Sequence, residues 1–276
     1  MMIDSGADGI TMTISLCVVG ATGKFGRAII SQASSDVRIS GAVCSNNNPA
    51  IGKTLGELGL RESETVIQDA SHVVDASADS DVVLSVSRPE ADMINIPKIV
   101  AQGKRIVVGT TGFTHIQSEI LNSSLKKVPA IMAPNFSVGA NIIFQITRLA
   151  SRFNNLYDYS IVEEHHRLKI DAPSGTAKTM LQLLSQDSRP PVTITDRSAS
   201  PKRMEGEVEL VSLRGGGTPG IHQLILSGEH DMIRVEHVAF SRTAFAAGAL
   251  IACKWIASQN QAGIYSMDDV LGLTRR

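Results

Sequence analysis

Residues 13–30 combine a strand-forming run, a glycine-rich turn and an apolar helical start, and no other part of the chain restricts the fold as much. The run TISLCVV is rich in β-branched and apolar residues, and the turn GATGKFG follows it at residues 20–26. In a dinucleotide-binding unit, the glycines allow a tight turn, close approach of the backbone to a pyrophosphate, and close packing of helix on strand. The spacing is G-x-x-G-x-x-G rather than G-x-G-x-x-G, so an ordinary structural turn is the alternative. The strand and helix that flank the turn favour the dinucleotide-binding interpretation.

Strand and helix patterns alternate up to about residue 135, which predicts a parallel sheet covered by helices. The loops at residues 20–26, 109–113 and 134–137 each follow a predicted strand. We therefore expect them at the carboxyl edge of the sheet, where open α/β sheets bind ligands. The predicted strands are 39–44, 82–86, 105–108 and 130–133, and the predicted helices are 90–102 and 116–126.

The second half of the chain has a different pattern, in which several strands follow one another. We predict helices at 140–153 and 176–185, an exposed loop at 186–203, and strands at 157–164, 207–213, 221–227 and 232–240. Successive strands predict an open mixed or antiparallel sheet, so the fold class is α/β: a Rossmann-like parallel sheet domain plus a second α+β domain. A final helix, 244–257, is too apolar to stand exposed and is expected to return to the first domain.

These patterns predict a discontinuous domain order. Residues 1–136 and 244–276 form the expected dinucleotide-binding domain, and residues 137–243 form the expected substrate-binding and oligomerisation domain. Residues 1–12 precede the first strand and are expected to be a flexible tail, or to lie upstream of the true start if Met12 is the initiator.

The segment EEHHRLKIDAPSGTA, residues 163–177, is the strongest candidate for a functional site. A segment with so many ionisable residues is costly to bury unless something binds there. His165 and Lys169 offer protons, and the Ser174-Gly175-Thr176 step offers hydroxyls and free amides where a helix begins. These groups predict a pocket for a small dianion beside an acid, whereas the alternative is a solvated strand-to-helix turn.

Composition excludes several other classes of protein. A net charge of −1 and an aromatic content of 4% argue against a nucleic-acid partner. No apolar run approaches the roughly 20 residues of a membrane span, and residues 1–12 lack the basic region of a secretory signal. Cys17, Cys44 and Cys253 form no C-x-x-C pair, which predicts a reducing, cytoplasmic location and no metal site.

The chain resembles the dihydrodipicolinate reductases, also called 4-hydroxy-tetrahydrodipicolinate reductases, of lysine and diaminopimelate biosynthesis. The resemblance runs from about Ile14 to Leu273. It rests on four motifs in order: VVGATGKFG at 18–26, GTTGF at 109–113, NFSVG at 135–139 and EHHR at 164–167 with its continuation to Ala177. The last motif is highly specific.

The resemblance implies a nicotinamide cofactor, NADPH or NADH, a small cyclic dicarboxylate substrate, and a homotetramer joined through the open sheet. It implies that His165 is the acid and that Lys169 is its proton-donor partner. The implied substrate contacts are His166, Lys169, Ser174, Gly175 and Thr176. The loops and the resemblance together give the expected cofactor contacts: Gly20, Ala21, Thr22, Gly23, Lys24, Phe25, Gly26, Ser45, Arg88, Gly109, Thr110, Thr111, Pro134, Asn135 and Phe136.

The expected ribose site leaves the choice of cofactor open. Sites for NAD usually place a carboxylate at the end of the second strand, but here the turn reads Cys44-Ser45-Asn46-Asn47. No carboxylate repels a 2′-phosphate, and Lys24 and Arg88 are the cations that could attract one. The turn slightly favours NADPH.

Two other functions share some of these features. A different two-domain Rossmann reductase, such as a sugar or homoserine dehydrogenase, would share the glycine loop but has no reason to carry the HHRLK segment before a Ser-Gly-Thr helix start. A non-catalytic redox sensor that binds a dinucleotide would need no proton donor. The segment at 163–177 therefore favours the reductase.

Overall fold

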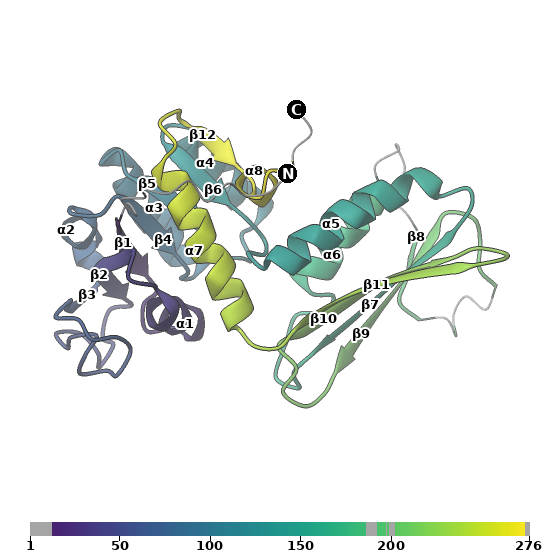
Figure 1. Ribbon diagram of the computed structural model, residues 1–276, viewed down its shortest axis with the longest axis horizontal. Coiled ribbons are helices and arrows are strands. Elements are labelled where there is room, and N and C mark those ends of the chain that lie inside the picture. Colours follow the sequence, from purple (N-terminus) through teal and green to yellow (C-terminus); the bar gives the residue numbers. More distant parts are fainter. Residues whose placement is uncertain (1–12, 186–191, 197, 199–201, 274–276) are drawn as a thin grey trace, which may run out of the picture. The chain divides into compact units, whose positions relative to one another are not determined.

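The computed structural model describes residues 13–185, 192–196, 198 and 202–273 (Figure 1). Contacts divide the chain into two compact units. The first is the chain up to Ile131 with Cys253–Ile264, and the second is Met132–Ala252 with the chain from Tyr265 onward. The predicted tail, residues 1–12, and part of the predicted loop 186–203 lie outside the described residues. No described helix is long and apolar enough to cross a membrane.

The first unit is built on a seven-stranded sheet with the order β12-β6-β5-β4-β1-β2-β3. All pairings from β3 through β1 to β5 are parallel. The chain moves outward from β1 in one direction and then from β4 in the other, so the sheet has a switch point between β1 and β4. This sheet confirms the predicted Rossmann-like fold. Its elements are β1 (Ile14–Val19), α1 (Lys24–Gln32), β2 (Val37–Cys44), β3 (Ile67–Asp69), η1 (Ala70–His72), α2 (Val73–Ser77), β4 (Val82–Ser85), α3 (Pro89–Ala101), β5 (Arg105–Val108), α4 (His115–Leu125), β6 (Pro129–Met132) and β12 (Gly263–Tyr265).

The glycine turn between β1 and α1 depends on the absence of side chains. Gly20 has a φ of +92°, and a Cβ there would lie 2.5 Å from the carbonyl oxygen of Val86. A Cβ on Gly26 would lie 2.2 Å from the carbonyl oxygen of Gly20, so only glycine lets α1 start so close to β1. The predicted structural roles of the first and third glycines are confirmed.

The second unit is a five-stranded mixed sheet with the order β11-β10-β7-β9-β8. Strand β10 is antiparallel to β7 and β11, whereas β9 is parallel to β7 and β8. Its elements are α5 (Val138–Ala150), η2 (Ser151–Phe153), β7 (Asp158–His165), α6 (Gly175–Leu184), β8 (Val192–Ile194), β9 (Glu207–Arg214), β10 (Gly220–Ser227), β11 (Met232–Ala239) and α8 (Met267–Val270), and α7 (Thr243–Ala257) crosses the boundary between the units.

One face of this sheet is covered by α5 and α6, as Figure 1 shows. Burial along β7 alternates residue by residue, as expected when one face packs on helices and the other stays open. The core includes Phe144 of α5, Met180 of α6, and Ile161 and Leu224 of the sheet. This arrangement confirms the predicted open mixed sheet.

The sequence missed several short elements. Strand β8 lies inside the predicted loop 186–203, where it pairs with the edge of β9. The elements β3, η1, α2, β12 and α8 have only three to five residues each, too few to show a clear period.

Candidate active site

Strand β7 brings Glu163 and His165 to the same face of the second sheet, because alternate residues of a strand point the same way. His165 is 8% exposed and Glu163 is fully buried. The Glu163 carboxylate is hydrogen-bonded to Nδ1 of His165. This bond fixes the ring and leaves Nε2 as the nitrogen that can exchange a proton with a bound molecule.

Glu163 has further hydrogen-bond partners besides His165. Nη2 of Arg214 lies 2.8 Å from its Oε1, and the backbone N–H of Ser174 donates to the same oxygen at 3.3 Å. Burial alone would raise the pKa of Glu163, but hydrogen bonds from His165, Arg214 and Ser212 lower it to about 2. Glu163 is therefore a carboxylate at neutral pH, and it keeps a proton on Nδ1 of His165.

A second histidine, His222 of β10, packs against the first. The two ring centroids are 5.1 Å apart with the planes at 72°, and Nε2 of His222 lies 3.1 Å from Oγ of Ser174. Burial, reinforced by the charge of His165, lowers the pKa of His222 to about 3. His222 is therefore neutral at physiological pH, and of the two histidines only His165 has a carboxylate partner.

The start of α6 lies beside these histidines. Ser174 caps the helix, because its Oγ accepts from the backbone N–H of Ala177 at 3.2 Å. Oγ1 of Thr176 accepts from Nδ2 of Asn135 at 3.0 Å. The structure thus brings the predicted substrate residues Ser174, Gly175 and Thr176 together at a helix N-terminus, where partial positive charge favours an anion.

The two remaining residues predicted to bind substrate, His166 and Lys169, lie in the loop between β7 and α6. Nζ of Lys169 is 2.8 Å from both carboxylate oxygens of Asp171. Nε2 of His166 lies 3.4 Å from Nη2 of Arg242, a cation that the sequence analysis did not single out. The structure therefore pairs Lys169 with Asp171 rather than with His165.

In the first unit, the glycine turn is tied to the end of β2. The backbone N–H groups of Gly20 and Ala21 both donate to the carbonyl of Val43, at 2.8 and 2.9 Å. Oγ1 of Thr22 accepts from Nδ2 of Asn48 at 3.2 Å. The predicted contacts at 20–26 and at Ser45 therefore belong to neighbouring loops.

The loops after β4 and β5 are linked in the same way. The N–H of Gly109 donates to the carbonyl of Ser85 at 2.8 Å, and the N–H of Ser87 donates to Oγ1 of Thr110 at 2.9 Å. Arg88, Gly109, Thr110 and Thr111 therefore lie at the carboxyl ends of paired strands. The remaining predicted contacts, Pro134, Asn135 and Phe136, group with the second unit.

Sequence reasoning assigned no role to Glu163, Arg214 or His222. Glu163 lies two residues before His165 in a predicted strand, so the strand period could have paired them. Arg214 and His222 come from other strands, and the sheet register sets Arg214 opposite His165 and His222 opposite Glu163. No local pattern in the sequence contains that register.

Glu163, His165 and His222 also form a group that could hold a metal ion, with ligand atoms all within 4.8 Å of one another. Arg214 already pairs with Glu163 at 2.8 Å, and its charge opposes a second cation. The hydrogen-bonded arrangement fits proton transfer better than metal binding.

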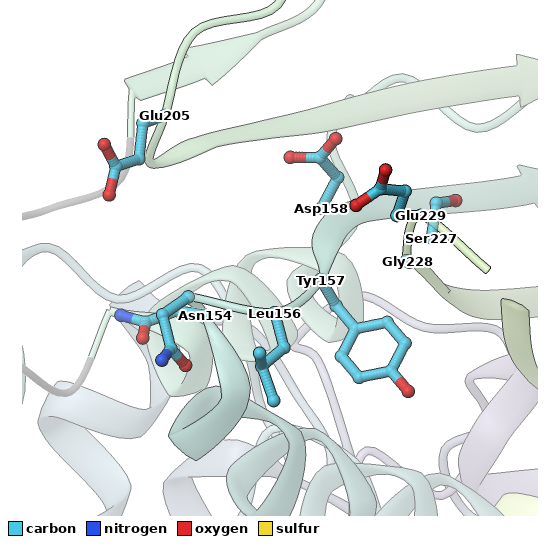
Figure 2. Close-up of a pocket in the computed structure, with 9 residues that line it drawn as sticks. Asn154, Leu156, Tyr157, Asp158, Glu205, Ser227, Gly228 and Glu229 are labelled. Atoms are coloured by element: carbon cyan, nitrogen blue, oxygen red, sulfur yellow. The ribbon is translucent and has the colours of Figure 1, made fainter. Parts of the chain in front are cut away.

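A hollow of about 420 Å³ lies at the opposite end of β7 (Figure 2). Asp158 begins this strand and His165 ends it, so the hollow is about 20 Å from the histidines. Its lining carries the three carboxylates Asp158, Glu205 and Glu229, which would repel a dicarboxylate. The hollow is therefore unsuited to the predicted substrate.

Comparisons with known proteins identify the family of the chain. The family description "Dihydrodipicolinate reductase, N-terminus" matches residues 14–136, and "Dihydrodipicolinate reductase, C-terminus" matches residues 139–271. The 4-hydroxy-tetrahydrodipicolinate reductase of Methanopyrus kandleri is 35% identical over 266 residues, covering 94% of this chain and 96% of that protein. The enzyme of the same name from Nitrosospira multiformis is 34% identical, covering 95% and 98%.

The fold also has a close counterpart among solved structures. The dihydrodipicolinate reductase of Paenisporosarcina sp. TG-14, solved with dipicolinate bound, superposes with a TM-score of 0.68 at 23% identity, covering 92% of this chain and 98% of that one. Because both halves of the chain match the family and relatives above 30% identity span nearly all of it, the chain belongs to the dihydrodipicolinate reductase family.

Proposed function

We propose that the protein reduces 4-hydroxy-tetrahydrodipicolinate to tetrahydrodipicolinate, with NADPH or NADH, in lysine and diaminopimelate biosynthesis. The observation that carries this proposal is the hydrogen-bonded chain Arg214–Glu163–His165, in which Glu163 and His165 are buried, beside the start of α6. It places a proton donor, His165 held by Glu163, next to a helix N-terminus that can bind carboxylates, and reduction of a cyclic dicarboxylate needs these two features together. A sugar dehydrogenase or a dinucleotide sensor does not need a proton donor and a carboxylate site side by side.

The cofactor supplies a hydride, and the chain supplies the proton. Loss of water from the hydroxylated ring gives a C=C–C=N system, and hydride addition to it leaves negative charge that one proton neutralises. His165 donates that proton from Nε2, with Lys169 as its proton-donor partner, while Glu163 stabilises the charged imidazole through Nδ1. Ser174, Gly175 and Thr176, with His166 and Lys169, orient the carboxylates.

The glycine turn fits a dinucleotide, because Gly20 and Gly26 leave no room for side chains between strand and helix. We assign the cofactor to residues 1–136 and 244–276 and the substrate to residues 137–243. The contacts are the turn at 20–26, Ser45, Arg88, residues 109–111 and residues 134–136. The acid-free turn after β2 supports a modest preference for NADPH.

The second sheet supports assembly of a homotetramer. Its face opposite α5 and α6 carries half-buried apolar residues such as Val211, Ile221 and Ile225, and Leu213 beside them is 47% exposed. A large apolar face of this kind is typical of a subunit interface. A biosynthetic role and unpaired, buried cysteines fit the cytoplasm.

The test is oxidation of NADPH and NADH by the purified protein with freshly prepared 4-hydroxy-tetrahydrodipicolinate, and titration of both cofactors without substrate. We expect His165→Gln to lower kcat by about 10²-fold or more, because a proton donor is lost, and to leave the cofactor Kd unchanged. His230→Gln, at an exposed histidine, is the matched control. Turnover of a sugar or homoserine instead, or cofactor binding without any turnover, would contradict the proposal.

A further inference from the structure

A buried carboxyl group lies beneath the loops that follow β4 and β5. Asp92, in the first turn of α3, is fully buried. Its Oδ1 accepts from Oγ of Ser85 at 2.6 Å and from Oγ of Ser87 at 2.8 Å. Its Oδ2 is buried and has no hydrogen bond of normal length from any described residue, although the hydroxyl of Thr110 lies near enough to favour the charged form.

These contacts join two loops. Ser87 donates through its hydroxyl to Asp92 and through its backbone N–H to Oγ1 of Thr110. Ser85, the other donor to Asp92, accepts from the backbone N–H of Gly109. Asp92 thus accepts directly from Ser85 and Ser87, and through them it is linked to Gly109 and Thr110 in the loop after β5.

A purely structural account explains this residue only in part. An acidic side chain in the first turn of a helix is stabilised by the helix dipole. This applies equally to Glu90, which lies two residues before Asp92 in the same turn. Glu90, however, is exposed, whereas Asp92 is buried among hydroxyls with no cation paired to it among the described residues. Burial raises the pKa of Asp92, so the carboxyl is costly where it lies.

The position of these loops in the sheet indicates which part of a dinucleotide they would serve. Strands β2 and β3 lie on one side of β1, and β4 and β5 lie on the other. In such sheets each half holds one mononucleotide, and the glycine turn after β1 begins the adenosine half. The loops above Asp92 belong to the other half.

We propose that Asp92 is a positioning residue that holds the two loops of the nicotinamide half in the shape that binds the cofactor. This proposal rests on the proposed use of a nicotinamide dinucleotide. Asp92 need not touch the cofactor, because it acts through Ser87 and Thr110.

The experiment measures binding rather than turnover. The Kd values of NADPH, NADH and ADP, as a probe of the adenosine half alone, are measured by calorimetry for the wild type, Asp92→Ala, Asp92→Asn and Glu90→Gln. We expect Asp92→Ala to raise the Kd of both dinucleotides about tenfold, the effect of losing one strong buried hydrogen bond, and to change the Kd of ADP less than twofold. Asp92→Asn keeps an acceptor for the serines, so its Kd values for the dinucleotides should lie between those of the wild type and of Asp92→Ala. Glu90→Gln should have the Kd values of the wild type.

The outcomes separate this proposal from the proposed function. If the wild type binds neither dinucleotide, the proposed function fails and the role of Asp92 fails with it. If the wild type binds them but both Asp92 variants bind equally well, only the role of Asp92 is overturned. If Asp92→Ala weakens ADP as much as the dinucleotides, the residue is structural and the proposal is overturned. If Asp92→Ala does not fold, the Kd values of the dinucleotides and of ADP are compared for Asp92→Asn and Ser87→Ala instead.

Discussion

Glu163 and Asp92 are both fully buried carboxyl groups, one in each unit, yet their surroundings shift their pKa values in opposite directions. Glu163 is bonded to Arg214 and His165, and its pKa falls to about 2 despite burial. Asp92 is bonded to hydroxyls alone, and burial raises its pKa. Burial therefore does not decide ionisation here; the presence of a cationic partner does.

The difference matches the work that each site is proposed to do. A proton donor needs a fixed negative charge next to it, so that the imidazole is easily charged and keeps one orientation. Two loops held in one shape for cofactor binding need an acceptor for several donors, and they need no fixed charge. The following predictions test this contrast, beginning with the largest expected effect.

Replacing Glu163 by Gln removes the charge and keeps the shape. We expect kcat to fall about 10²- to 10⁴-fold, because the imidazole of His165 loses the negative charge that supports its proton transfer, and the new amide N–H₂ can occupy the place of the acceptor oxygen beside Nδ1. The cofactor Kd should stay within twofold of the wild-type value, since Glu163 belongs to the second unit. Steady-state kinetics and cofactor titration measure both quantities.

Glu164→Gln is the control for this variant. Glu164 is the next residue on β7 and points to the other face, where its Oε1 accepts from Oγ1 of Thr218 at 2.9 Å. The Glu164→Gln variant loses the same negative charge as Glu163→Gln but leaves the bond between Glu163 and His165 unchanged. Equal losses of activity in the two variants would show that net charge, and not the Glu163–His165 bond, supports turnover.

Arg214→Met makes Glu163 more like Asp92, because it removes the permanently charged partner of a buried carboxylate and leaves His165 as the remaining ionisable one. We expect the free energy of unfolding at pH 7 to fall by about 3 kcal/mol. Urea unfolding measures this loss, and Arg234→Met, at an exposed arginine in the same sheet, should change stability little.

The loss in Arg214→Met should depend on pH with a definite sign. The pKa of Glu163 is lowered from its ordinary 4.5 to about 2 in the folded protein, so its ionised form adds stability above pH 4.5 that is lost as the pH falls toward 2. His165 and Arg214 both lower this pKa, so without Arg214 part of that contribution is absent. The difference between wild type and variant should therefore be smaller at pH 3 than at pH 7, and a difference that grows at low pH would count against the ion pair.

Gly220→Ala leaves both carboxyl groups unchanged and disturbs the geometry of the acid alone. A Cβ on Gly220 would lie 3.1 Å from Nε2 of His165 and 3.5 Å from Cε1 of His222. Because Glu163 holds the other side of the ring, we expect kcat to fall about tenfold, the usual scale for overpacking. Gly217→Ala, where a Cβ meets nothing within 4 Å, should keep wild-type activity, and equal activity in both variants would show that the ring has room to move.

Long, periodic elements could be predicted from the sequence, whereas short ones could not. The strand at 105–108 was predicted with the bounds of β5, and the helix at 176–185 lies within one residue of α6. Strand β8 consists of three β-branched residues, which suit a strand but are too few to show a period, and its place in the sheet depends on pairing with β9.

The residues of the candidate site also fall into those that local sequence could predict and those that only the fold brings together. The sequence by itself determined the glycine turn and the helix start at Ser174, and it singled out His165 as the candidate acid, because each depends on residues a few positions apart. Only the tertiary structure placed Arg214 and His222 against Glu163 and His165, and Asp92 beneath Ser87 and Thr110. Those contacts depend on strand register and on buried side chains from distant segments, and the ionisation of a buried group depends on such neighbours rather than on its own place in the chain.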